Sequence, residues 1–183
     1  MRVFIAIDLP HDLRKSLGKL QKDLRPTTDT ARWVPPDSIH ITLKFIGELP
    51  ETRLDEIDEA LLGLSWTPVA VSVRGVGFFP GARSPRLFWA GMEAPTMPGL
   101  AEELDARLER RGFEREKRAF RPHITLARAR DTRIDNALVA AAQTYETYEF
   151  GSFTADRVFL FQSVLKPSGA VYSKVREYLL ERT

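Results

Sequence analysis

The tetrapeptide His-Ile-Thr-Leu occurs twice in this chain, beginning at His40 and at His123. On a β-strand, residues i and i+2 share a face about 6.6 Å apart, so His40 should point the same way as Thr42, and His123 the same way as Thr125. The chain of 183 residues has only three histidines. Two of the three therefore lie in the same local pattern, and these two are the first candidates for chemistry.

Two imidazoles and two hydroxyls suit acid–base catalysis at a phosphodiester. An imidazole titrates at about pH 6.5, so near neutral pH one ring can accept a proton from water while the other donates one to a leaving oxygen. Threonine hydroxyls and nearby arginines can donate hydrogen bonds to the non-bridging phosphate oxygens. If the two strands share one cleft, the motifs predict displacement at phosphorus without a metal.

Two other interpretations of the motifs stay open. A zinc site would need a third ligand, but no predicted strand offers another histidine or a carboxylate at ligand spacing, and cysteine is absent, so we expect no metal. Each motif alone would also suit an ordinary strand, because β-branched threonine favours strands. The matching context of the two copies favours the catalytic interpretation. His11 follows a proline at a predicted helix start, and we expect it in a loop or cap.

Hydrophobic periodicity predicts strands and helices in the same order in both halves of the chain, which suggests a duplicated lobe. The apolar run near the N-terminus is too short for a signal sequence or a membrane span and predicts a buried strand. Strands are expected over 1–8, 38–45, 69–79, 86–90, 122–127, 150–165 and 171–178, and helices over 13–24, 52–62, 100–108 and 134–138. Strict alternation would turn Ile41, Leu43, Ile124 and Leu126 toward the core.

Composition is that of one compact domain over residues 1–183, with 43% hydrophobic residues and a net charge of +2. The absence of cysteine fits a reducing, cytoplasmic location.

Residues 107–133 contain ten Lys/Arg against four Asp/Glu. This stretch predicts either a solvated helix-and-loop surface or a track for a phosphate backbone.

Nearly the whole chain resembles one family, the bacterial and archaeal RNA 2′,3′-cyclic phosphodiesterases, also called 2′-5′ RNA ligases, of the two-histidine phosphoesterase superfamily. The resemblance is carried by residues 1–10, 32–34, 39–47, 77–80, 85–89, 120–128 and 160–163, with Gly169 and Tyr172. It implies a bilobal α+β fold in which two antiparallel sheets face a central cleft, with helices outside and a pseudo-two-fold duplication. The chain would then be a single phosphodiesterase domain of two similar lobes.

The resemblance also implies an activity and residue roles. The enzyme would hydrolyse RNA 2′,3′-cyclic phosphate ends to 2′-phosphomonoesters, with reversible 2′-5′ joining as a side activity. His40 would be the proton donor and His123 the proton acceptor, while Thr42 and Thr125 would hold the phosphate. No cofactor is implied.

Three further residues are candidates for substrate binding: Lys44, Phe45 and Arg128. Alternation points Arg128 away from the Thr125 face unless the strand end twists. Phe45 could stack on a nucleobase, as aromatic platforms do, but alternation places it on the core side of its strand, and a core role is expected.

Alternatives of other classes remain. The enzyme could prefer a small cyclic nucleotide to RNA, or the protein could bind RNA ends without catalysis, although a binder would not need two titrating imidazoles. We expect the partners to be RNA ends or nucleotides that carry a 2′,3′-cyclic phosphate, with no membrane association and a monomeric state.

Overall fold

The computed structural model describes residues 1–167 and 169–180 and confirms the predicted order of strands and helices. The short strand β2 was not predicted, because three residues are too few to show a period. The elements are β1 (Arg2–Asp8), α1 (His11–Leu24), β2 (Ala31–Trp33), β3 (His40–Glu48), α2 (Leu54–Leu61), β4 (Val69–Phe79), β5 (Leu87–Glu93), α3 (Met97–Glu109), β6 (Ile124–Ala129), α4 (Asn136–Ala142), β7 (Glu149–Ala155), β8 (Arg157–Lys166) and β9 (Gly169–Leu179).

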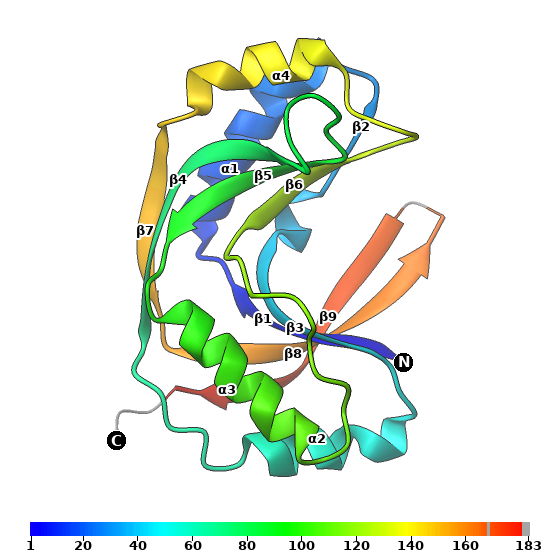
Figure 1. Cartoon of the computed structure of the whole chain (residues 1–183), viewed down its shortest axis with the longest axis vertical. Coiled ribbons are helices and arrows are strands. Elements are labelled where there is room, and N and C mark those ends of the chain that lie inside the picture. The colour runs from blue at the N-terminus through cyan, green and yellow to red at the C-terminus, as the bar shows by residue number, and fades with distance from the viewer. Residues whose placement is uncertain (168, 181–183) are drawn as a thin grey trace.

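The strands form two antiparallel sheets (Figure 1). Sheet A has the order β3-β1-β8-β9, and sheet B has the order β2-β6-β5-β4-β7. Each His-Ile-Thr-Leu strand begins an equivalent row of four, β3-β1-β8-β9 in one sheet and β6-β5-β4-β7 in the other. Strand β2 then adds to sheet B beside β6. The strand order thus shows the duplication that the repeated tetrapeptide suggested.

The helices cross between the two halves. Helix α1 follows β1 of sheet A but packs on β7 of sheet B, and it also contacts α4. Helix α3 follows β5 of sheet B but packs on β3 of sheet A, and it also contacts α2. Because each half supplies a helix to the other, the two sheets are held by shared packing as well as by the chain connections.

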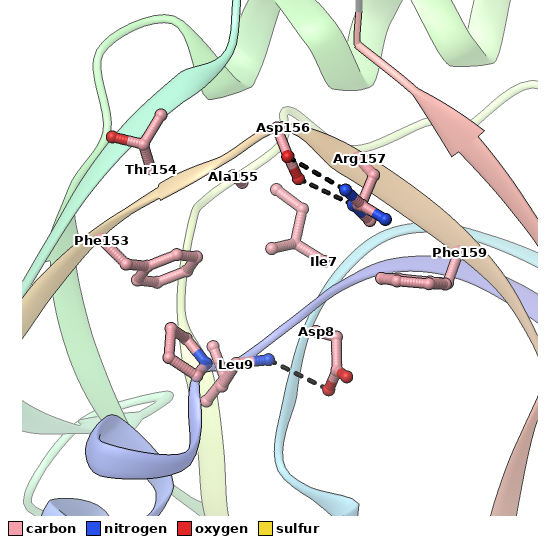
Figure 2. A pocket seen from close by; sticks show the side chains of 10 residues that line it. Ile7, Asp8, Leu9, Phe153, Thr154, Ala155, Asp156, Arg157 and Phe159 are labelled. Carbon is pink, nitrogen blue, oxygen red and sulfur yellow. Dashed lines mark hydrogen bonds and ion pairs between the residues drawn. The ribbon is translucent and has the colours of Figure 1, made fainter.

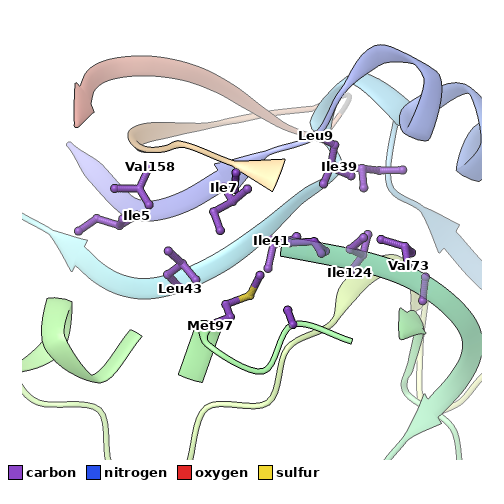
Figure 3. Close-up of a cluster of buried hydrophobic side chains, with 14 of the residues drawn as sticks. Ile5, Ile7, Leu9, Ile39, Ile41, Leu43, Val73, Met97, Ile124 and Val158 are labelled. Atoms are coloured by element: carbon purple, nitrogen blue, oxygen red, sulfur yellow. The ribbon is translucent and has the colours of Figure 1, made fainter. Parts of the chain in front are cut away.

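One buried cluster of apolar side chains runs through both halves (Figure 3). Ile41 and Ile124, the second residues of the two motifs, both belong to it and are 0% exposed. Leu43 and Leu126 are also buried, which confirms the predicted core side of each motif. Each such side chain contributes about 1.5 to 3 kcal/mol of burial free energy, so the apolar positions of the motifs anchor the polar ones.

Within the described part of the chain, no helix combines the length and the apolar character needed to cross a membrane.

Candidate active site

His40 is the first residue of β3 and lies opposite Asp8 of β1, while Thr42 lies opposite Ala6. Residues directly opposite in an antiparallel pair point to the same side, so His40 and Thr42 share one face of sheet A. The His40 Nδ1 atom is 2.8 Å from the carbonyl oxygen of Ser38. A carbonyl oxygen can only accept a hydrogen bond, so Nδ1 carries the proton and Nε2 is left to exchange protons with a substrate.

His123 is anchored in the same way. It comes directly before β6, is exposed, and its Nδ1 atom is 2.8 Å from the carbonyl oxygen of Arg121, again two residues earlier in the chain. The same tautomer follows, with Nε2 free for proton transfer. The second motif therefore reproduces the backbone anchor of the first as well as its residue types.

A β-bulge in β3 overturns the expected direction of Phe45. Ala6 pairs with Thr42 and Ile5 pairs with Lys44, so Leu43 is an extra residue without a partner in β1. An extra residue shifts the alternation by one position. Phe45 consequently lies on the same side as Thr42 and is 57% exposed, so the expectation that it packs in the core was wrong.

The same bulge turns the Lys44 side chain toward the interior of the protein. Its ammonium group forms an ion pair with Asp105 of α3 and donates a hydrogen bond to the carbonyl oxygen of Glu114, and the side chain is 3% exposed. The inclusion of Lys44 among the substrate-binding residues is therefore corrected. The strand period suggested that Lys44 lies on the same face as His40, but the bulge places it on the opposite face.

Strand β6 carries an equivalent bulge. Thr125 pairs with Trp89 and Ala127 pairs with Phe88, so Leu126 is the extra residue. Arg128 pairs with Leu87, which lies two residues from Trp89 and hence on the same face of β5. Arg128 therefore shares the face of Thr125, contrary to simple alternation. Its side chain is exposed and makes no ion pair or hydrogen bond with any residue that the structure describes.

The charge of Arg128 reaches His40. Burial lowers the pKa of His40 below its ordinary value of 6.5, and its hydrogen bond to the Ser38 carbonyl opposes this effect. The positive charges of Arg14 and Arg128 lower the pKa further, while the negative charge of Asp8 raises it. Arg128 belongs to sheet B and His40 to sheet A, and β3 contacts β6. A charge on the strand of the second motif therefore lowers the pKa of the histidine of the first motif.

Aromatic rings surround His40 on its own face of sheet A. The ring centroid of Phe4 is 4.7 Å from that of His40, Tyr172 meets His40 edge-on at 5.1 Å, and Phe161 is 5.9 Å away. Phe45 continues this group at 5.9 Å from Phe4. Sequence reasoning did not assign Phe4 or Phe161 to the site, because an apolar residue on either face of a strand is compatible with a core position.

Asp8 joins the site to the segment before His40. Its carboxylate forms ion pairs with the Arg14 guanidinium and with Lys174 Nζ, the latter at 2.5 Å. Arg14 also donates a hydrogen bond of 2.8 Å to the carbonyl oxygen of Asp37. Sequence reasoning did not assign Arg14 or Lys174 to the site, because neither of these two residues lies near a His-Ile-Thr-Leu motif in the chain.

A cavity of about 200 Å³ lies beside Asp8 between β1 and the β7–β8 corner (Figure 2).

Among residues 1–167 and 169–180, no group of three or more His, Asp or Glu side chains is arranged to hold a metal ion. His11 is the exposed first residue of α1, directly after the N-cap Pro10. It lies at the helix start as expected, but within the helix and not in the loop or cap that the sequence suggested.

Comparison with known proteins matches residues 7–89 and 93–172 to the model of the LigT-like phosphoesterase family. An RNA 2′,3′-cyclic phosphodiesterase of Methanocaldococcus jannaschii is 31% identical over 97% of this chain and 100% of its own length. A crystal structure from Thermus thermophilus has a TM-score of 0.82 at 32% identity and covers 100% of this chain and 99% of its own. Escherichia coli LigT in complex with 3′-AMP has a TM-score of 0.79 at 24% identity, with 98% and 97% covered, and supports the fold alone.

Proposed function

Because the chain belongs to the LigT-like phosphoesterase family, we propose that it hydrolyses RNA 2′,3′-cyclic phosphate ends to 2′-phosphomonoesters. The observation that carries this proposal is the paired anchoring of His40 and His123. Each ring donates its Nδ1 proton to the carbonyl oxygen two residues earlier, at 2.8 Å in both cases. Both Nε2 atoms are thereby reserved for proton transfer.

The proposed reaction is a single displacement at phosphorus. Neutral His123 accepts a proton from water through Nε2 as the water oxygen bonds to phosphorus. Protonated His40 donates its Nε2 proton to the O3′ atom as the bond between phosphorus and O3′ breaks. The products are a 2′-phosphate and a 3′-hydroxyl, and proton exchange with solvent restores both rings. If an RNA 5′-hydroxyl replaces the water, the same transfers give 2′-5′ joining.

The groups that would hold the phosphate come from both sheets. Thr42 and Thr125 lie on the histidine faces of their strands and can donate hydroxyl hydrogen bonds to the non-bridging oxygens. Arg128 supplies a guanidinium on the Thr125 face that has no ion-pair partner among the residues the structure describes, and a guanidinium binds phosphate in bidentate fashion. The exposed Phe45 ring lies on the His40 side of the other strand, where it is available to stack on a nucleobase.

The pKa of His40 bears on its role as the donor. Burial favours the neutral ring in the free protein, whereas a proton donor must be charged when the leaving oxygen departs. A bound anionic phosphate supplies the opposite charge that raises the pKa of a neighbouring imidazole. The donor is therefore expected to gain its proton with the substrate.

Both motifs come from one chain, so we infer that a monomer is sufficient for activity, and the absence of cysteine suits a reducing cytoplasm.

The test is hydrolysis of an oligoribonucleotide with a 2′,3′-cyclic phosphate end, in the presence of EDTA, with the product identified as the 2′-phosphate. His40→Ala and His123→Ala should each lower kcat by about 10² to 10⁴. The double variant should not multiply these losses, since residues that act as a unit are not additive. His11→Ala is the matched control and should keep the full rate. Near wild-type turnover in both folded single variants would refute the mechanism and favour a protein that only binds RNA ends.

A further inference from the structure

The basic stretch at 107–133 divides into two parts that differ in how their charges are neutralised. Up to position 117, most of the cations form ion pairs with carboxylates of α2, α3 and the next loop: Arg107 with Glu103, Arg111 with Glu59, Arg115 with Glu109, and Lys117 with Glu114. Beyond that position, Arg118, Arg121, Arg128, Arg130 and Arg133 have no ion-pair partner among the described residues. The positive excess is thus concentrated around β6.

The cations beyond β6 gather with others into one surface, which we call the arginine surface: Arg32, Arg83, Arg128, Arg130 and Arg133. Arg32 of β2 pairs directly with Arg128 of β6. The Arg130 backbone N–H extends the same ladder with a 2.8 Å hydrogen bond to the carbonyl oxygen of Thr30. Arg133 reaches the carbonyl oxygen of Arg83 at 3.5 Å. All five side chains are exposed.

The carboxylates near this surface form no ion pair with its arginines in the part of the chain that the structure describes. One oxygen of Asp135 caps α4 by accepting the Leu138 N–H at 3.1 Å, and the other accepts the Thr28 hydroxyl at 2.9 Å. Asp29 and Asp131 are exposed and form no ion pair with an arginine in the described part of the chain. Like charges directly opposite on neighbouring strands are unfavourable, so Arg32 beside Arg128 reduces stability unless an anion lies between them.

We propose that the arginine surface binds the phosphodiester backbone of the RNA strand that leads to the cyclic phosphate. The inference rests on the proposed function, because Arg128 shares the Thr125 face and so connects the surface to the reacting end. The cyclic phosphate is a 3′ end, so the bound nucleotides lie on its 5′ side. Guanidinium groups bind successive phosphates by charge and paired hydrogen bonds. The substrate is then an RNA of several nucleotides, preferred over a mononucleotide.

The test compares cyclic-phosphate substrates of one, two, four and eight nucleotides. The variant is Arg32→Gln/Arg130→Gln, which leaves the residues around the reacting phosphate intact. Its control is Lys15→Gln/Lys19→Gln, which removes the same charge from exposed positions of α1. For the wild type, KM should fall as the RNA lengthens. The arginine variant should raise the KM of the octamer about tenfold and reduce its salt slope by about 1.4, with kcat and the mononucleotide KM unchanged.

Equal changes in KM for the mononucleotide and the octamer would overturn the inference, and so would an equal loss in the lysine control or a wild-type KM that does not depend on length. A second measurement separates the inference from the proposed function. A labelled octamer with a 3′-hydroxyl end should bind the wild type and lose affinity in the arginine variant, as measured by fluorescence anisotropy. Binding of this kind without hydrolysis of any substrate would refute the proposed function and keep the RNA surface. Absence of octamer binding at low salt would reject the surface, and an acidic protein partner would become the better explanation.

Discussion

Replacing Lys44 with methionine should destabilise the protein, because it removes one charge from a buried ion pair. The side chains of Lys44 and Asp105 are 3% and 10% exposed. In the variant, the Asp105 carboxylate keeps a hydrogen bond from the Glu116 N–H at 3.1 Å and a longer contact of 3.7 Å with Arg115. The carbonyl oxygen of Glu114 loses the donor that it has in the native protein.

The size of the effect follows from the burial and from the contacts that remain. Removing one partner of a buried pair costs about 3 to 5 kcal/mol, since the other charge stays buried without compensation. Arg115 and the Glu116 N–H still contact Asp105, so we expect the lower end, about 3 kcal/mol. This is a large part of the 5 to 15 kcal/mol that is typical of a domain. Urea unfolding followed by tryptophan fluorescence should show a lower midpoint with an unchanged slope.

Two further variants make this prediction refutable. Arg111→Met removes an exposed partner of Glu59, with side-chain exposures of 45% and 58%, and should cost less than about 1 kcal/mol. Lys44→Met/Asp105→Asn removes both charges and should cost less than the sum of the single changes. If Lys44→Met costs no more than Arg111→Met, the buried pair does not stabilise the fold as argued.

The remaining predictions concern the candidate site. Thr42→Ala and Thr125→Ala should each lower kcat by roughly 10-fold to 10³-fold, less than the histidine variants, because other donors still reach the phosphate; losses as large as those of the histidines would assign the hydroxyls a role in proton transfer. Phe45→Ala should instead raise KM by about 5-fold to 150-fold, since base stacking contributes about 1 to 3 kcal/mol, and an unchanged KM would remove the stacking role. For the pH dependence, burial lowers the pKa of His40 in the free protein. As the pH rises, the ring therefore loses its proton at a pH lower than 6.5. The alkaline limb of kcat/KM should therefore lie at lower pH than that of kcat, and titration of His40 by NMR should move upward with bound phosphate; titration above 6.5 in the free protein would contradict the argument.

Much of the fold could be predicted from the sequence, because periodicity is a local property. Apolar residues at helical spacing predicted α1, a short apolar run predicted β1, and alternation predicted the start of β3. The repeated His-Ile-Thr-Leu tetrapeptide indicated which two strands correspond, and the order of strands in the two sheets agrees with that correspondence. The pairing of each histidine with its threonine on one face also followed from the strand period alone.

Tertiary structure decided what the strand period could not. A bulge is defined by the partner strand: Leu43 and Leu126 are extra residues only because β1 and β5 provide nothing opposite them. The extra residue in β3 turned Phe45 toward the histidine face and buried Lys44, and the extra residue in β6 turned Arg128 toward the face of Thr125. Burial and long-range charge likewise depend on neighbours distant in the chain, as for Phe4 beside His40 or Arg32 beside Arg128. The sequence by itself therefore determined the reactive groups, whereas the pairing of strands decided which side chains surround them.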